Sequence, residues 1–256
     1  MVRRALVVEM MKVRRSPVPL TTATLIVALV PLMCLGFLAL SQSGGLGPAA
    51  AKAQGMIVGE GWEAYIGLLG QMLAVTLFIG PGVVVAWAFG REFADRTFPS
   101  LFALPVSRGA IAAAKFLVLL VWGVVLTLLV LGVALAAGLA AGVEGRGDID
   151  LVAEFGRLLL AGALTIAMAL TIGLVASLAR GYLAAIGAII LLTMAAQIAV
   201  SLGTGGWFPF ASPGLLAVAG ADGVPPVTPA QLALVPVTAL AAAIATTRWW
   251  STTEVT

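Results

Sequence analysis

The sequence predicts an all-α, polytopic membrane protein, and three observations support this fold class. Of the 256 residues, 61% are hydrophobic and only 10% are charged, whereas a soluble domain needs about a quarter of its residues charged. The apolar residues form about six long runs. These runs are continuous rather than alternating, and a helix satisfies its own backbone groups in lipid, so we expect helices rather than barrel strands.

Each run is long enough to cross a bilayer, which takes about 20 apolar residues. The runs predict spans over residues 18–40, 66–90, 115–141, 158–179, 182–202 and 230–247. The first span is too long for the core of a cleaved signal peptide, so we interpret it as a retained anchor. Six spans with modest loops fill the chain, which predicts a single transmembrane domain over residues 1–256.

The positions of the basic residues predict how the spans are oriented. If the spans alternate across the membrane, eleven of the fourteen basic residues lie on one side: Arg3, Arg4, Lys12, Arg14, Arg15, Arg91, Arg96, Arg108, Lys115, Arg180 and Arg248. Lys52, Arg146 and Arg157 lie on the other side. Because positive residues concentrate in cytoplasmic loops, we expect both termini in the cytoplasm and the protein in the cell membrane. The net charge of +3 therefore reflects membrane topology and not nucleic-acid binding.

The segment between the second and third spans, residues 91–110, is the most informative part of the chain. Arg91 with Asp95 and Glu92 with Arg96 have i, i+4 spacing, so each pair shares a helical face. Phenylalanines and leucines recur at helical spacing on another face, namely Phe89, Phe93, Leu101 and Leu104. This pattern predicts a helix along the membrane surface, with a break at residues 97–100 caused by Pro99 and a second short turn before Pro105.

Two functions fit this segment. It is either a solvated loop whose charges only fix topology, or a docking element whose exposed phenylalanines and paired charges seat in a groove on a cytoplasmic partner.

The loop before the last span is long and rich in aromatic residues and proline. Trp207, Phe208 and Phe210 belong at the membrane interface, and Ser212 with Pro213 predicts the cap and first turn of a short helix through Ala219. A re-entrant hairpin and a plain interfacial loop both remain open.

Polar side chains are rare within the spans. Gln71 and Gln197 are the two most worth testing, either as contacts along a substrate path or as interhelical hydrogen bonds. Aspartate, glutamate, lysine and arginine are confined to the ends of the predicted spans, which disfavours an ion-coupled carrier.

Several kinds of chemistry are excluded by missing residues. The sequence holds no phosphate-binding loop of the GxxxxGK[ST] type and no histidine, and its one cysteine, Cys34, lies in an apolar run. We therefore expect no catalytic residues, no metal site and no cofactor on this chain.

The residues between the second and third spans resemble a family motif. They are Glu92, Arg96-Thr97, Leu101, Leu104, Pro105-Val106-Ser107-Arg108 and, at the start of the next span, Lys115. This series is similar to the corresponding segment of type-2 ABC exporter permeases, as are the six-span layout, the basic amino-terminal segment and the aromatic loop before the last span. The motif covers only about twenty residues, and this chain has Arg96 where the family usually has glycine.

The resemblance implies a permease subunit whose cytoplasmic coupling helix docks on a separate ATP-binding cassette ATPase. The implied ATPase-coupling residues are Arg91, Glu92, Asp95, Arg96, Thr97, Pro105 and Arg108. Family permeases work in pairs, so a second permease copy is also implied, with ATP and Mg held by the ATPase subunits. The implied function is export of an amphipathic or hydrophobic substrate, such as a drug, a peptide antibiotic or a lipid.

The amino-terminal segment, residues 1–17, fits the same resemblance as an interfacial elbow helix. The pair Arg3-Arg4 recurs eleven residues later as Arg14-Arg15, about three helical turns away and so on the same face. Such a face either contacts anionic membrane lipid or serves only as a topology signal. Two other functions stay open for the whole chain: a membrane anchor or assembly factor that recruits a cytoplasmic partner, and an ion-coupled secondary multidrug carrier.

Overall fold

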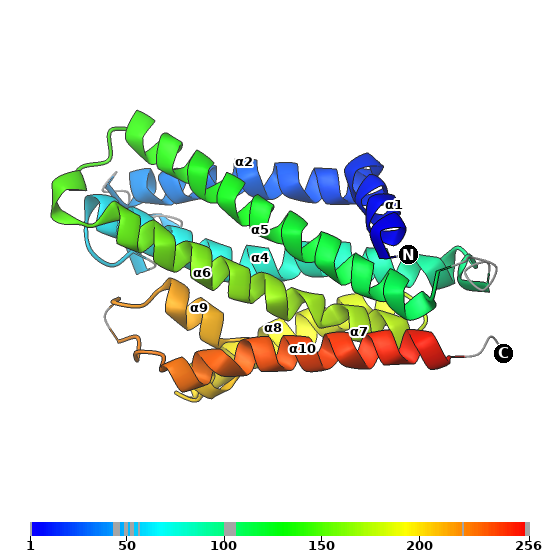
Figure 1. The fold of residues 1–256 in the computed structure, drawn as a ribbon. Helices are drawn as coiled ribbons and strands as arrows, with labels where there is room; N and C mark the ends of the chain where they lie inside the picture. The colour runs from blue at the N-terminus through cyan, green and yellow to red at the C-terminus, as the bar shows by residue number, and fades with distance from the viewer. Residues whose placement is uncertain are drawn as a thin grey trace.

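The computed structural model describes residues 2–42, 47–48, 51, 54–55, 57–99, 106–221 and 223–253. Within these ranges the chain contains helices and no strands (Figure 1). Six helical segments of the described residues are long and apolar enough to span a membrane: α2 (Pro17–Gln42), α4 (Gly61–Ala94), α5 (Arg108–Ala140), α6 (Leu151–Leu170) with α7 (Ile172–Leu178), α8 (Leu183–Ser201) and α10 (Pro229–Thr252). The predicted all-α polytopic fold is confirmed.

Helices α4 and α5 extend beyond the spans that the apolar runs predict. Helix α4 includes Glu63 near its start and Glu92 near its end, and α5 begins seven residues before Lys115. The predicted spans, residues 66–90 and 115–141, are shorter because charged residues interrupt the apolar pattern near their ends. The helical backbone continues through Glu92 and Lys115 because their charges are paired inside the protein.

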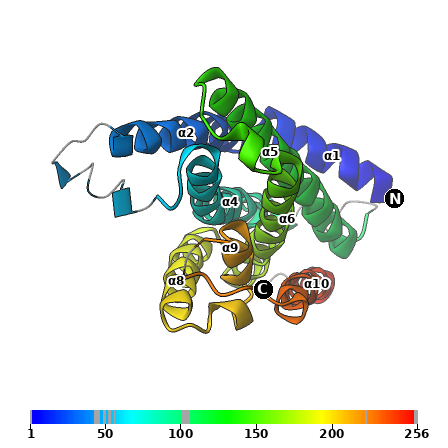
Figure 2. The same ribbon diagram turned by 90° about the vertical axis from the view of Figure 1, so that its left-hand side faces the viewer.

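Helix α4 lies at the centre of the bundle, surrounded by α2, α5, α6, α8 and the short helix α9 (Ser212–Ala217) (Figure 2). Helices α8 and α10 lie at the periphery and bury few of their apolar side chains. At Gly90, α4 contacts the turn between α7 and α8 backbone to backbone, because a Cβ there would lie 2.7 Å from the amide nitrogen of Tyr182.

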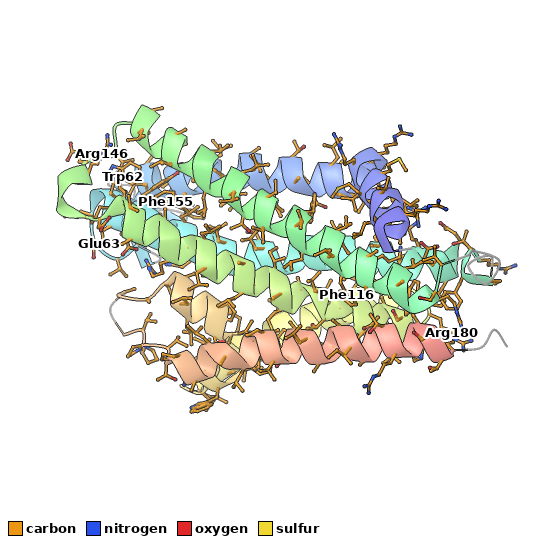
Figure 3. The ribbon with its side chains drawn as sticks, in the orientation of Figure 1. Trp62, Glu63, Phe116, Arg146, Phe155 and Arg180 are labelled. Atoms are coloured by element: carbon orange, nitrogen blue, oxygen red, sulfur yellow. The ribbon has the colours of Figure 1, made fainter. Side chains whose placement is uncertain are left out.

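The start of α1 (Val2–Arg15) and the end of α10 lie at the same end of the bundle (Figure 1). Helix α1 crosses this end at a steep angle to the long helices and packs against α5. We call the end formed by α1, the end of α4, the start of α5 and the end of α10 the basic end. The opposite end carries η2 (Arg146–Asp148), α9 and the start of α4, and Figure 3 shows Glu63 and Arg146 there and Arg180 at the basic end.

Buried apolar side chains form two clusters along the bundle. The cluster nearer the basic end joins α1, the second half of α4, the first half of α5, the end of α6, α7, the first half of α8 and α10. The other joins α2, the first half of α4, the second half of α5 and the start of α6. Helices α4 and α5 contribute residues to both clusters, so each of them runs continuously from one end of the bundle to the other.

The loop before α10 contains η3 (Gly205–Trp207) and the short helix α9. Helix α9 packs against α4 and α6, and its Pro213 and Leu215 are buried, which favours the hairpin reading over a plain surface loop. Trp207 is exposed, as expected for an interfacial residue, whereas Phe210 packs on Phe78 of α4. The predicted cap is wrong: the N-cap is Ala211, and the buried Ser212 hydroxyl has no hydrogen-bond partner among the described residues.

Candidate functional site

Four charged side chains from three helices meet at the basic end. Lys115 Nζ of α5 lies 2.9 Å from Glu9 Oε2 of α1 and 2.9 Å from Glu92 Oε1 of α4. Lys12 Nζ of α1 lies 2.8 Å from Glu9 Oε1 and 3.0 Å from Glu92 Oε1. We call Glu9, Lys12, Glu92 and Lys115 the ionic cluster. It holds two acids and two bases, so its charges cancel and α1 is tied to both α4 and α5.

The central member of the ionic cluster is Lys115. Its side chain is only 1% exposed, and its ammonium donates to Glu9, to Glu92 and to the carbonyl oxygen of Ala88 at 3.0 Å. An ammonium has three N–H groups, so every donor of Lys115 has an acceptor. Burial of a charge is costly unless it is paired and hydrogen-bonded. The geometry around Lys115 meets this requirement.

Lys12 is the outermost member of the cluster. Burial alone would lower the pKa of its ammonium, but the attraction and hydrogen bonds of Glu9 and Glu92 outweigh it and raise the pKa above the ordinary value of 10.5. Lys12 is therefore charged at every physiological pH, and its contribution to stability is lost only as the pH rises above that range.

Helix α4 ends in a tight turn that rests on the ionic cluster. The Thr97 hydroxyl donates to Glu92 Oε2 at 2.8 Å, so both carboxylate oxygens of Glu92 are used. Arg96 follows the C-cap residue Asp95 and has φ of 55°. This left-handed conformation is the one in which helices commonly end with glycine. The hydrogen bond between Thr97 and Glu92 therefore holds the turn that begins the segment between α4 and α5.

We expect Arg96→Gly to raise the free energy of unfolding by about 1 kcal/mol, because a residue with a Cβ is strained at positive φ. Ala94→Gly is the matched control. Ala94 is exposed and lies in the last turn of α4, so glycine there should lower the free energy of unfolding by about 0.5–1 kcal/mol. Denaturant titration of the detergent-solubilised protein measures both. Equal losses in the two variants would contradict the role assigned to φ.

An aromatic cluster lies beside the ionic cluster. Phe93 stacks on Phe98 with ring centroids 4.5 Å apart, and the buried Trp250 of α10 makes edge contacts with Phe89, Phe93 and Phe98. The Trp250 indole N–H donates to Ser177 Oγ of α7 at 2.9 Å. These contacts attach the end of α10 to both α7 and the turn after α4.

Arg108 completes this attachment from the start of α5. Its guanidinium donates to the carbonyl oxygens of Ser251, at 3.0 Å, and Thr253. Gly109 allows the close approach, since a Cβ there would lie 2.4 Å from Ser251 Oγ. The described ends of the segment between α4 and α5 are thus both held, at Phe98 by aromatic packing and at Arg108 by the carboxy-terminal turn of α10.

Comparison with known proteins decides the family. Residues 5–196 match the family described as ABC-2 family transporter protein. The chain belongs to this family. The bacitracin transport permease protein BCRB of Bacillus licheniformis is 30% identical over 125 residues, a stretch that is 48% of this chain and 60% of that relative's length. The protein is thus a multi-pass membrane protein of the ABC-2 transporter family.

The structure of this ABC-2 permease divides the expected coupling residues into two groups. Asp95, Arg96 and Thr97 are exposed at the turn, and Arg91 is half-buried, where it pairs with Asp95 at 3.9 Å and lies over the Trp87 ring. The Arg91–Asp95 pairing is confirmed. Glu92 and Arg108 are engaged in internal contacts. Pro105, with Leu101 and Leu104, lies outside the described residues.

Two expectations about this segment are wrong. Glu92 pairs with Lys12 and Lys115 rather than with Arg96, because the helix ends before Arg96 can complete another turn. Phe89 and Phe93 are not exposed on a surface helix. They lie in the last turns of α4, where Phe89 is fully buried against Phe116 and Trp250. Lys115 also lies two turns inside α5, so a buried charge does occur within a spanning helix.

The structure does not bring the two glutamines together. Gln71 lines a cavity at the opposite end of this permease, between α4 and α6. Gln197 is exposed on α8 and is not among the residues that line this cavity.

Sequence reasoning missed Glu9, Lys12, Ser177 and Trp250 as parts of the site. A signal for Glu9 was present. It is the only acidic residue in the basic segment 1–17, and it shares a face with Ala5 and Val13 at spacings of four. That face is the buried one. No comparable pattern marks Trp250.

Proposed function

We propose that the protein is the permease subunit of an ATP-driven exporter and that a separate ATPase docks at the basic end. The observation that carries this proposal is the exposed turn at Asp95, Arg96 and Thr97, which rests on the ionic cluster. An exposed charged turn on a rigid base can pass a partner's motion into a bundle. Because Glu92 belongs to the base and not to the docking surface, we assign it a positioning role.

The basic end would face the cytoplasm. Arg4, Arg14 and Arg15 are exposed on α1, and together with Arg91, Arg96 and Arg180 they concentrate positive charge at this end, as cytoplasmic loops do. Helix α1 would lie in the headgroup layer with Met10, Met11 and these arginines turned outward. Both termini would then be cytoplasmic, in the cell membrane.

The mechanism follows from these positions. Hydrolysis of ATP, held together with Mg by the ATPase, would supply the energy, and the permease itself would make and break no covalent bond. Movement of the turn at Asp95 shifts the end of α4 and the start of α5, and the ionic cluster makes α1 follow. Since α4 and α5 cross both apolar clusters, the shift reaches the opposite end of the bundle.

A second permease copy would cover the exposed side of α8. This helix exposes Leu191, Met194 and Ile198 together with the polar Gln197. A glutamine in lipid lacks hydrogen-bond partners, whereas at a helix–helix interface it gains them. The cargo would be amphipathic or hydrophobic, a drug, a peptide antibiotic or a lipid, and the name of the Bacillus licheniformis relative, a bacitracin transport permease, supports a peptide antibiotic. Family membership favours this function over a membrane anchor or an ion-coupled carrier.

The test reverses the exposed charges. We expect Asp95→Lys combined with Arg96→Glu to weaken co-purification with a co-expressed ATPase at least tenfold and to lower ATP-dependent efflux, with no change in unfolding temperature. The matched control reverses two charges at the opposite end, Glu144→Lys with Arg146→Glu, and should leave both properties unchanged. Unchanged ATPase binding in the Asp95 and Arg96 variant would refute docking at this turn.

A further inference from the structure

A cavity of about 190 Å³ opens at the opposite end of the bundle, remote from the ionic cluster. One wall is α4, where Glu63, Ile66, Gly67 and Gln71 recur at spacings of three, four and eight and so share a helical face. Gly67 leaves this wall open, since a Cβ there would meet no atom of the described residues within 4 Å. Figure 3 shows Glu63 at this end of the bundle. We call this space the outer cavity.

The facing wall is built from α6 and the segment after α9. Arg157 of α6 donates to Glu154 and, at 2.9 and 2.8 Å, to the carbonyl oxygens of Leu216 and Ala217 at the end of α9. The guanidinium therefore holds α9 against α6, and its charge is neutralised by Glu154. Apolar side chains complete the lining, among them Ile149 and Val218.

The charge balance of the outer cavity favours a cation. Its described lining carries two carboxylates, Glu63 and Glu154, and one guanidinium, so the sum is −1. Glu154 and Arg157 neutralise each other, which leaves the negative charge on Glu63. Glu63 is exposed, so an incoming group can reach it from water. The cavity is smaller than the roughly 300–1,000 Å³ of drug-sized pockets, so it suits one polar headgroup with a short apolar stem.

We propose that the outer cavity binds the cationic head of an amphiphile, an ammonium or guanidinium group paired with Glu63 while its apolar stem lies against Ile66 and Val218. Only the further claim that this amphiphile is exported as cargo rests on the proposed function. Binding itself is a property of the permease alone. The cavity would then select cationic over anionic amphiphiles at the end remote from the ATPase.

The experiment measures binding to the purified permease in nanodiscs of neutral lipid, without ATPase or nucleotide. The probes are hexylammonium and hexanoate, which share chain length and differ in charge, and binding is followed by calorimetry with empty nanodiscs subtracted. We expect hexylammonium to bind at least tenfold more tightly than hexanoate. Glu63→Gln should remove this preference, and Gly67→Met should abolish binding of both probes by filling the cavity.

Matched controls separate the cavity from general effects. Glu60→Gln removes a nearby exposed carboxylate outside the outer cavity, and Gly156→Met adds the same side chain to open space on α6. Both should bind hexylammonium as the parent does, and all four variants should unfold at the parent temperature. Equal binding of the two probes to the parent protein, or an unchanged preference in Glu63→Gln, would overturn the proposal. Since no ATPase is present, loss of ATPase docking in the earlier test leaves this result unaffected.

Discussion

Replacing Lys115 with methionine should lower the free energy of unfolding by about 3–5 kcal/mol, because it removes the buried cation that faces Glu9 and Glu92. Methionine fills similar volume, so the loss comes from two carboxylates whose remaining cationic partner among the described residues is Lys12. Helix α1 should then detach. Denaturant titration measures the stability, and trypsin cleavage after the exposed Arg14 and Arg15 should become faster.

Two further variants test the electrostatic origin of this loss. Lys12→Met removes the same charge from a side chain that is 30% exposed. It should therefore lower the free energy of unfolding clearly less than Lys115→Met does. Adding Glu92→Gln to Lys115→Met leaves one acid, Glu9, and one base, Lys12. The free energy of unfolding of the double variant should therefore be higher than that of Lys115→Met by about 1 kcal/mol or more. A Lys115→Met protein as stable as Lys12→Met would show that the ionic cluster does not hold α1.

Trp250→Ala should be comparably destabilising, by about 3–5 kcal/mol, because the indole is fully buried among Phe89, Phe93 and Phe98. The substitution leaves a cavity and also leaves the Ser177 hydroxyl without its indole donor. The end of α10 should separate from the turn after α4. The measurement is again the free energy of unfolding in denaturant.

Trp207→Ala is the matched control for this prediction. Trp207 is 64% exposed in η3, so the same loss of atoms should cost less than about 0.5 kcal/mol in detergent. Similar costs for the two tryptophans would mean that the aromatic cluster does not brace the basic end.

The fold was predictable because apolar runs of spanning length dictate helices in lipid, and all six spans are confirmed among the described residues. Their ends were less predictable. The pattern stops at a charge such as Lys115, whereas the helix continues wherever folding supplies partners for that charge. Those partners, Glu9 and Glu92, lie 106 and 23 residues away in the sequence, and no pattern close to Lys115 predicts these contacts.

The candidate site was only partly predictable for the same reason. The i, i+4 rule correctly paired Arg91 with Asp95, because both lie at the end of one helix. It failed for Glu92 and Arg96, because the helix ends at Ala94, Arg96 has a positive φ, and distant lysines compete for the Glu92 carboxylate. The place of Arg108 in the motif was evident, but its contact with the end of α10 depends on tertiary packing.

The contact at Gly90 has a consequence for how far a movement can spread. Where α4 meets the turn at Gly181 and Tyr182, main chain touches main chain and no flexible side chain lies between them. Such a junction cannot absorb displacement by rotamer changes. We therefore expect a shift of the last turns of α4 to displace the start of α8 as well.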